Sequence, residues 1–171
     1  MDNVAELAFS EYRDHFRNWD YYIAEWSRMS QLSKTGSVLI AESEGTLVGG
    51  VCYIPPGRPR PTWINEEWGV IRSLVVSPAH RGKGIGKALT ERCLVMAKED
   101  RCHKIGVQTS PIMQAAVSIY ERMGFMEAKT LGTKDGVTWK LYCIDIHNKR
   151  VTPFPKKPSR KNHTEGWPTT E

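Results

Sequence analysis

The hydrophobic pattern along the chain changes from a helical to a strand-like period near residue 36. Between residues 5 and 32, aromatic and aliphatic side chains recur at alternating spacings of three and four, which predicts one helix or two helices broken near Asn18. Apolar runs at 37–43 and 46–54 predict two strands that form a hairpin, because Glu44-Gly45 between them is a favourable turn.

The second half of the chain alternates strands with helices, after four prolines between residues 55 and 61 that require a loop. The expected strands lie at 70–76, 104–109, 126–131 and 138–144, the last two joined by a turn at Asp135-Gly136. Apolar residues from Ile85 to Ala97 trace one face of a helix. Ser110 is expected to cap a further helix, which Pro111 opens and Gly124 ends. This alternation predicts a mixed α/β fold.

Composition narrows the class of protein. With 171 residues, 40% of them hydrophobic and 25% charged, the chain has the composition of one ordinary globular domain. No apolar run approaches the roughly 18 residues that a membrane span needs, and no secretory signal precedes the first helical segment. We therefore expect a cytoplasmic protein.

The net charge of +5 comes mostly from the end of the chain. Residues 148–171 hold six Lys or Arg, two acids and four of the ten prolines, so we expect a basic, disordered tail there. Residues 1–147 form the expected domain and are almost neutral, with 18 basic and 17 acidic residues. A nucleic-acid-associated protein that acts through its tail is therefore only an alternative.

The cysteines give no sign of a metal site. Cys52, Cys93, Cys102 and Cys143 form no C-x-x-C pair and no cluster with histidine at zinc-site spacing. We expect no metal, and we interpret these residues as reduced thiols packed among apolar side chains. Since none of them lies in the setting of an activated nucleophile, a covalent cysteine intermediate is not expected.

The glycine-rich run RGKGIG at 81–86, between a predicted strand and a predicted helix, is the feature most informative about function. The first amides of a helix are unpaired and carry partial positive charge, and glycine lets a phosphate approach them. Arg81, Lys83 and Lys87 add full positive charges. These residues predict a site for an anion of about the size of a diphosphate.

The spacing in this run differs from that of the common nucleotide motifs. A P-loop has the motif G-x-x-x-x-G-K-S/T. If Gly86 and Lys87 are aligned with its G-K pair, the first glycine is replaced by Arg81 and the Ser or Thr by Ala88. The dinucleotide fingerprint G-x-G-x-x-G also fails, because Lys87 follows where a third glycine is needed. A plain glycine-rich turn with solvated basic side chains remains the alternative.

These residues resemble the GNAT superfamily of N-acetyltransferases. The family motif Q/R-x-x-G-x-G/A is matched by Arg81, Gly84 and Gly86. Residues 74–78, LVVSP, are similar to the end of the family's fourth strand, and residues 116–125, AVSIYERMGF, to its A-x-x-x-Y-E-x-x-G-F segment. The resemblance covers roughly residues 36 to 145, with the segments in the family's order and spacing.

The resemblance implies a fold and a bound co-substrate. The fold is a central, mostly antiparallel sheet of six or seven strands, with helices on both faces and with the parallel fourth and fifth strands splayed apart. Acetyl-CoA would lie between the strands that end at Val76 and Thr109, with its diphosphate on the amides of 82–87. The family's first strand is missing or rudimentary here, because the chain opens in a helical pattern. The expected cofactor-binding residues are Leu74, Val75, Val76, Arg81, Gly82, Lys83, Gly84, Ile85, Gly86 and Lys87.

The resemblance also implies transfer of an acetyl group to an amine. Tyr120 stands where the family has its general acid, and a phenol can protonate a departing thiolate. Many relatives carry a glutamate base where Val70 stands here, so Glu66 and Glu67 upstream are the candidate bases. Met113 replaces an asparagine that contacts the cofactor in many relatives.

The resulting prediction is direct acetyl transfer from acetyl-CoA to a primary amine of a small molecule or a protein. Glu66 and Glu67 favour a cationic acceptor, and Trp63, Trp68 and Tyr53 could grip it beside the proline-rich loop. His80 is interpreted as a solvated turn residue. A homodimer is compatible with the sequence, which specifies no oligomeric state. A non-catalytic domain that binds or senses acyl-CoA is the main alternative, because it would keep the loop and lose the chemistry.

Overall fold

The structure, a computed structural model, describes residues 1–147, so the expected tail at 148–171 lies outside the described residues. The helices are α1 (Asp2–Phe9), α2 (Trp19–Trp26), α3 (Ile85–Glu99) and α4 (Gln114–Arg122), with 3-10 turns η1 (Ser10–His15), η2 (Met29–Lys34) and η3 (Pro78–His80). The strands are β1 (Ser37–Ser43), β2 (Thr46–Ile54), β3 (Gly69–Val76), β4 (Lys104–Thr109), β5 (Met126–Lys134) and β6 (Val137–Asp145).

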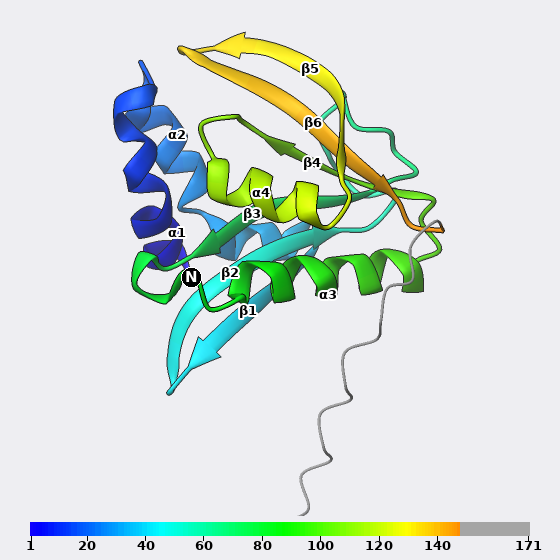
Figure 1. Cartoon of the computed structure of the whole chain (residues 1–171), viewed down its shortest axis with the longest axis horizontal. Helices are drawn as coiled ribbons and strands as arrows, with labels where there is room; N and C mark the ends of the chain where they lie inside the picture. The colour runs from blue at the N-terminus through cyan, green and yellow to red at the C-terminus, as the bar shows by residue number, and fades with distance from the viewer. Residues whose placement is uncertain (148–171) are drawn as a thin grey trace, which may run out of the picture.

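The six strands form one sheet in the order β1-β2-β3-β4-β6-β5 (Figure 1). The β3–β4 pair is parallel and the other four pairs are antiparallel. Glu44 and Gly45 between β1 and β2 both have positive φ, 51° and 75°, as a tight hairpin turn requires. The predicted α/β class, the mostly antiparallel sheet and its size are confirmed.

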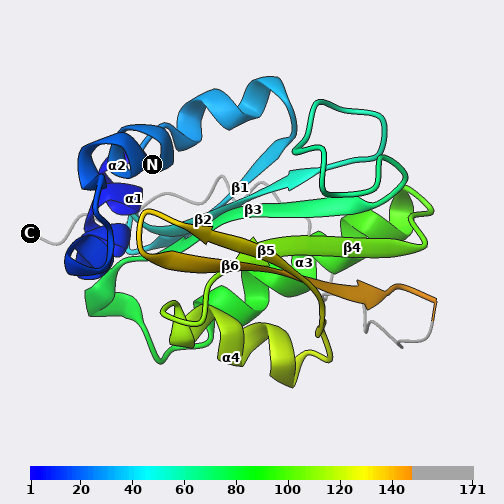
Figure 2. The same ribbon diagram turned by 90° about the horizontal axis from the view of Figure 1, so that it is seen from above.

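Helices cover both faces of the sheet, as predicted (Figure 2). On one face, the apolar side of α3 packs into the main core, where Cys93 and Leu94 meet Ile71 and Ile105 of the sheet. On the other face, α1 and η2 pack with Val75 of β3 in a second cluster. The four cysteines are free thiols, three of them buried, which agrees with their predicted role as small apolar residues.

The parallel strands β3 and β4 pair over only part of their length. Their register consists of Gly69 with Ile105, Val70 with Gly106, and Ile71 with Val107. Beyond Ile71, β3 remains paired with β2 as far as Val76, across an irregularity where Ser73 has a φ of 55°. The edge of β3 that faces β4 is therefore unpaired from residue 72 onward. This confirms that the two strands splay apart.

The N-terminal segment contains two helices with a break near Asn18, one of the two predicted arrangements, because Phe16 and Asn18 have non-helical backbone angles that separate η1 from α2. One part of the secondary structure differs from the prediction. The fourth helix begins at Gln114, not at Pro111, because the chain first makes a turn in which the Met113 amide donates to the Ser110 carbonyl at 2.9 Å. Ser110 therefore caps no helix, and its buried hydroxyl has no hydrogen-bond partner within residues 1–147.

The segments α1, η1, α2 and η2 precede all six strands, and β1, the first strand of the described chain, lies at one edge of the sheet. Within residues 1–147, no strand precedes β1. None of the helices in this range has both the length and the apolar character that crossing a membrane requires.

Candidate functional site

The loop between η3 and α3 presents free backbone donors. Gly82 and Gly84 have φ of 76° and 80°, a conformation that is strained for other residues. Gly84 is the N-cap residue of α3, and no side chain caps this helix. The amides of the first turn, beginning at Ile85, are therefore available to a ligand, at the end of the helix dipole that favours an anion.

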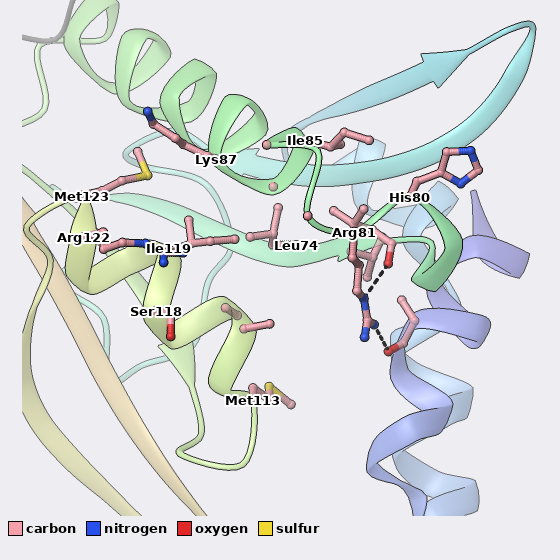
Figure 3. A pocket seen from close by; sticks show the side chains of 18 of the residues that line it. Leu74, His80, Arg81, Ile85, Lys87, Met113, Ser118, Ile119, Arg122 and Met123 are labelled. Atoms are coloured by element: carbon pink, nitrogen blue, oxygen red, sulfur yellow. Dashed lines mark hydrogen bonds between the residues drawn. The ribbon is translucent and has the colours of Figure 1, made fainter.

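These amides line a cavity of about 660 Å³, which we call the loop cavity (Figure 3). Its walls come from the end of β3, the 80–87 loop, helix α4 and the α1–η1 segment. A cavity of this volume is of the size that holds a cofactor. The residues that line it are Ala8, Phe9, Tyr12, Leu74, Val75, Val76, His80, Arg81, Gly82, Gly84, Ile85, Gly86, Lys87, Met113, Ala115, Ala116, Ser118, Ile119, Arg122 and Met123.

Nine of the ten expected cofactor-binding residues line the loop cavity, and Lys83 is the exception. Sequence reasoning missed Phe9 and Tyr12, as well as Ser118 and Arg122 on α4. Ser118 and Arg122 are four residues apart, so a helical pattern places them on one face, which is a signal that could have been used. In Figure 3, Lys87 and Arg122 lie at the end of the cavity away from Arg81.

The side chain of Arg81 is directed toward the N-terminal helices (Figure 3). Its Nη1 atom lies 2.6 Å from Oε2 of Glu11, its Nη2 donates to the Ala8 carbonyl at 3.1 Å, and its Nε donates to the Val76 carbonyl at 3.3 Å. The hydrogen bond with Glu11 raises the pKa of Arg81. Burial opposes ionisation of Glu11, but its bonds with Arg81 and Tyr12 lower its pKa overall. Arg81 therefore brings no unpaired charge to the loop.

His80 agrees with the prediction only in part. It is half-buried and lines the loop cavity, and its Nδ1 atom is buried without a hydrogen-bond partner among the described residues. The interpretation of His80 as a turn residue is confirmed, since it is the last residue of η3, but the residue is not fully solvated.

A second cavity of about 560 Å³, which we call the aromatic cavity, lies between α2, the unpaired parts of β3 and β4, and the β5–β6 hairpin. It has many aromatic side chains and four charged ones. The aromatic residues are Phe9, Tyr21, Tyr22, Trp26, Trp63, Tyr120 and Trp139, and the charged residues are Glu25, Arg72, Lys129 and Lys134. Phe9, Leu74, Met113 and Ala116 line both cavities, so the two meet beside the splayed strands.

Tyr120 lies on α4 and lines the aromatic cavity close to Ala116, a residue shared by both cavities. Only 2% of the residue is exposed. Burial, together with Cys93 nearby, raises its pKa well above the ordinary value of 10. Its phenol therefore keeps its proton throughout the physiological range of pH, as a proton donor must.

Glu66 and Glu67 lie elsewhere. Both are exposed, and they precede the end of β3 that is paired with β4. Neither residue lines either cavity. The acidic side chain that does line the aromatic cavity is Glu25 on α2, at 3.6 Å from Arg28.

The aromatic residues flanking the proline-rich loop separate into two groups. Trp63 lines the aromatic cavity, as expected of a residue that grips a substrate. Tyr53 is buried at the far end of the sheet, where its hydroxyl donates to Asp100 at 2.8 Å. The ammonium of Lys104 lies 5.4 Å from the centre of the Trp68 ring. Tyr53 and Trp68 line neither cavity.

No group of His, Cys, Asp and Glu within residues 1–147 is arranged to hold a metal ion.

Similar structures share this fold. yncA from Salmonella typhimurium, solved with its cofactor acetyl-CoA, is 20% identical, with a TM-score of 0.55 over 80% of this chain and 78% of that one. A GNAT-family structure from Desulfovibrio desulfuricans is 18% identical, with a TM-score of 0.61 over 85% and 92% of the two chains.

Sequence relatives identify the family. The chain is 32% identical over 128 residues to "Probable N-acetyltransferase family 8 member 5" of Mus musculus, covering 75% of this chain and 55% of that protein. It is 34% identical over 144 residues to N-acetyltransferase 8F1 of Rattus norvegicus, covering 80% and 62%. The chain spans about half the length of the curated relatives it matches. Because residues 1–125 also match the Acetyltransferase (GNAT) family, the chain belongs to that family.

Proposed function

We propose that this protein transfers the acetyl group of acetyl-CoA to an amine held in the aromatic cavity. The observation that carries this proposal is the meeting of two cavities beside the unpaired edge of β3. One cavity presents free amides suited to a diphosphate, and the other presents aromatic and charged side chains suited to an acceptor. A reaction between two bound molecules needs such an arrangement, because it brings their reactive groups together.

The residues of the loop cavity fit acetyl-CoA. The amides of 82–87 would hold the diphosphate, and Lys87 and Arg122 add positive charge within the cavity. The backbone of Leu74 to Val76 would bond the amide groups of the pantetheine arm, because β4 does not pair with this edge. Leu74 and Met113 supply an apolar lining where the cavities meet.

Acetyl-CoA, when bound, supplies a thioester whose carbonyl carbon can accept an amine. The acceptor nitrogen forms the new C–N bond, the C–S bond breaks, and the sulfur of coenzyme A leaves as a thiolate. Tyr120 donates its phenolic proton to that thiolate, and the proton released by the nitrogen restores the phenol. No protein nucleophile enters the reaction, since buried Cys93 has its pKa raised to about 12 by desolvation.

The charges of the aromatic cavity favour an acceptor that carries a negative group as well as its amine. Arg72, Lys129 and Lys134 face one acid, Glu25. None of the three basic side chains forms an ion pair with an acid in the described chain, whereas Glu25 is already near Arg28. An acidic group on the acceptor would pair with these basic side chains, and the aromatic walls of the cavity would contact an apolar part of the acceptor.

The same charges help to activate the amine. Only the neutral amine can attack, and nearby positive charges lower the pKa of an ammonium group. This lessens the need for a strong base and is consistent with the placement of Glu66 and Glu67 outside both cavities. Glu25 is the carboxylate best placed to accept, through water, the proton that an ammonium group loses before it attacks; the proton lost by the nitrogen after attack restores the phenol of Tyr120. The cationic acceptor expected from Glu66 and Glu67 has no support in this arrangement.

A thiol-release screen tests the proposal. The purified protein is incubated with acetyl-CoA and a panel of amines, in matched sets that carry an acidic, a neutral or a basic group on the same aromatic body. We expect acceptor-dependent release of coenzyme A, with mass spectrometry showing the acetylated amine. Binding of acetyl-CoA without thiol release for any member of the panel, free amino groups of peptides included, would support the non-catalytic alternative.

A further inference from the structure

We propose that Arg81 is a positioning residue: its side chain holds the α1–η1 segment against the cofactor loop, so that this segment forms one wall of the loop cavity. The inference rests on the proposed function and deepens it. In this inference the partner of Arg81, the charged residue of the family motif, is Glu11, 70 positions away in the sequence, and not a phosphate.

The contacts of Arg81 join three parts of the chain. Through Glu11 it reaches η1, through the Ala8 carbonyl it reaches the last turn of α1, and through the Val76 carbonyl it reaches the end of β3. These contacts occupy the Nε, Nη1 and Nη2 atoms of the guanidinium group. Only arginine offers donors in this forked geometry. To reach a phosphate instead, the side chain would have to give up all or part of this set.

The end of α1 benefits from a cation. The last turn of this helix contains no basic residue, although the carbonyl groups there point out of the helix and carry partial negative charge. Arg81 supplies the missing positive charge from the loop by donating to Ala8. The guanidinium therefore stabilises the helix end and fixes it to the loop at the same time.

The wall that Arg81 holds lies at the site itself. Ala8, Phe9 and Tyr12 line the loop cavity, and Phe9 also lines the aromatic cavity. The ring of Phe9 lies 4.7 Å from that of Trp26 on α2, so a displacement of α1 would also move an aromatic wall of the second cavity. The ion pair therefore links the loop to the place where the two bound molecules would meet.

A direct role of Arg81 in binding the diphosphate makes a different prediction. In that case Glu11 competes with the phosphate for Arg81, and removing the charge of Glu11 should strengthen the binding of coenzyme A. If Arg81 instead positions the wall, loss of either partner has the same result. The Glu11→Gln variant therefore distinguishes the two roles.

The experiment is a double-mutant cycle with Arg81→Gln, Glu11→Gln and the double variant. The dissociation constant of coenzyme A is measured by calorimetry, and kcat and KM for the acceptor by thiol release. We expect each single variant to lower kcat/KM for the acceptor by about five- to tenfold, the range for a charged contact that is partly exposed. The double variant should be no worse than Arg81→Gln, because the contact with Glu11 is already lost in that single variant.

Two controls accompany the cycle. Arg92 and Glu99 form an exposed pair at 3.6 Å on α3, outside both cavities, so Arg92→Gln should leave the constants unchanged. Arg81→Lys keeps a charge for Glu11 but lacks the forked donors, so it should recover only part of the activity lost in Arg81→Gln. A role confined to general stability would give no such graded recovery in variants that are equally folded at the assay temperature.

Hydrogen exchange gives a readout that does not depend on catalysis. In the protein without ligand, amides of residues 2–15 should exchange several-fold faster in both single variants, and at least as fast in Arg81→Gln, which also loses the donors to Ala8 and Val76, as in Glu11→Gln. Tighter binding of coenzyme A by Glu11→Gln, or unchanged exchange in residues 2–15, would overturn the inference. If the wild-type protein binds no coenzyme A and acetylates no amine, the proposed function fails, and the exchange measurement still tests the contact.

Discussion

Ile71 and Val107 form the last backbone pair between the parallel strands β3 and β4. Beyond this pair, β3 bonds only with β2, and β4 bonds only with β6. A sheet with a gap of this kind exposes donors and acceptors that a folded protein normally pairs. Because the two cavities meet beside the gap, these groups are the natural partners of an extended ligand that carries amide groups.

Gly84→Ala is expected to weaken the binding of coenzyme A. Gly84 has a φ of 80° and an open space where a Cβ would lie, so the substitution strains only the backbone. Gly45, in the β1–β2 turn, has a φ of 75° and equally open surroundings, which makes Gly45→Ala a matched control. Both variants should lose about 1 kcal/mol in the free energy of unfolding. Only Gly84→Ala should also raise the dissociation constant of coenzyme A, by about tenfold or more. Equal affinity in the two variants would exclude the loop as the binding site.

Tyr120→Phe should lower kcat by at least about 100-fold, the usual contribution of a general acid. Tyr53→Phe is the control, since Tyr53 is equally buried but donates to Asp100, and neither residue lines a cavity. That variant should lose stability and retain its kcat. Because burial raises the pKa of Tyr120, the wild-type rate should rise with pH as the amine loses its proton and should not fall again near pH 10. A fall with a midpoint near pH 10 would contradict the assignment.

The Glu11–Arg81 contact predicts a specific dependence of stability on pH. The folded-state pKa of Glu11 lies below its ordinary value of 4.5, so the folded protein binds a proton there less readily than the unfolded chain does. The stabilisation is therefore fully present above pH 4.5 and is lost as the pH falls through the folded-state pKa. The difference in unfolding free energy between wild type and Glu11→Gln, about 0.5–1 kcal/mol for a partly exposed pair, should be constant from pH 7 to 5.5 and decrease as the pH falls below 4.5. Urea denaturation at each pH measures it, and a difference that does not decrease below pH 4.5 would show another origin.

Arg72→Gln should change the preference among acceptors more than the rate with the best neutral amine. Loss of a charge–charge contact with an acidic acceptor should raise its KM about tenfold, while the matched neutral amine changes little. Arg92→Gln, which lies outside both cavities, is the control. If acidic and neutral acceptors lose activity equally in Arg72→Gln, the residue does not select the acceptor by charge.

Local sequence patterns predicted those parts of the molecule that depend on neighbours in the chain. Three such parts are the β1–β2 turn, the apolar face of α3 and the glycine loop. Each is determined by residues that lie within one turn or one hairpin of the chain, so hydrophobic periodicity and turn residues indicate it directly. The same reliance on local sequence explains why the predicted start of α4, at Pro111, is wrong. Ser110 and Pro111 are good helix-starting residues, but the turn that brings the chain off β4 uses them first.

The composition of the candidate site could be predicted only in part, because its charges come from distant positions. Nothing near Arg81 in the sequence indicates that Glu11 is its partner. Arg72 and Lys129 lie on strands at different places in the sheet, and only the fold brings them to one cavity. Glu66 and Glu67 are close to β3 along the chain but line neither cavity, whereas Trp63, three residues before Glu66, lines the aromatic cavity.

The account depends above all on a diphosphate being held at the start of α3, and calorimetric titration of the folded protein with coenzyme A tests this most directly. We predict saturable binding of one coenzyme A per chain, weakened in Gly84→Ala and unaffected in Gly45→Ala. The absence of any saturable binding of coenzyme A or acetyl-CoA to the folded wild-type protein would contradict the account.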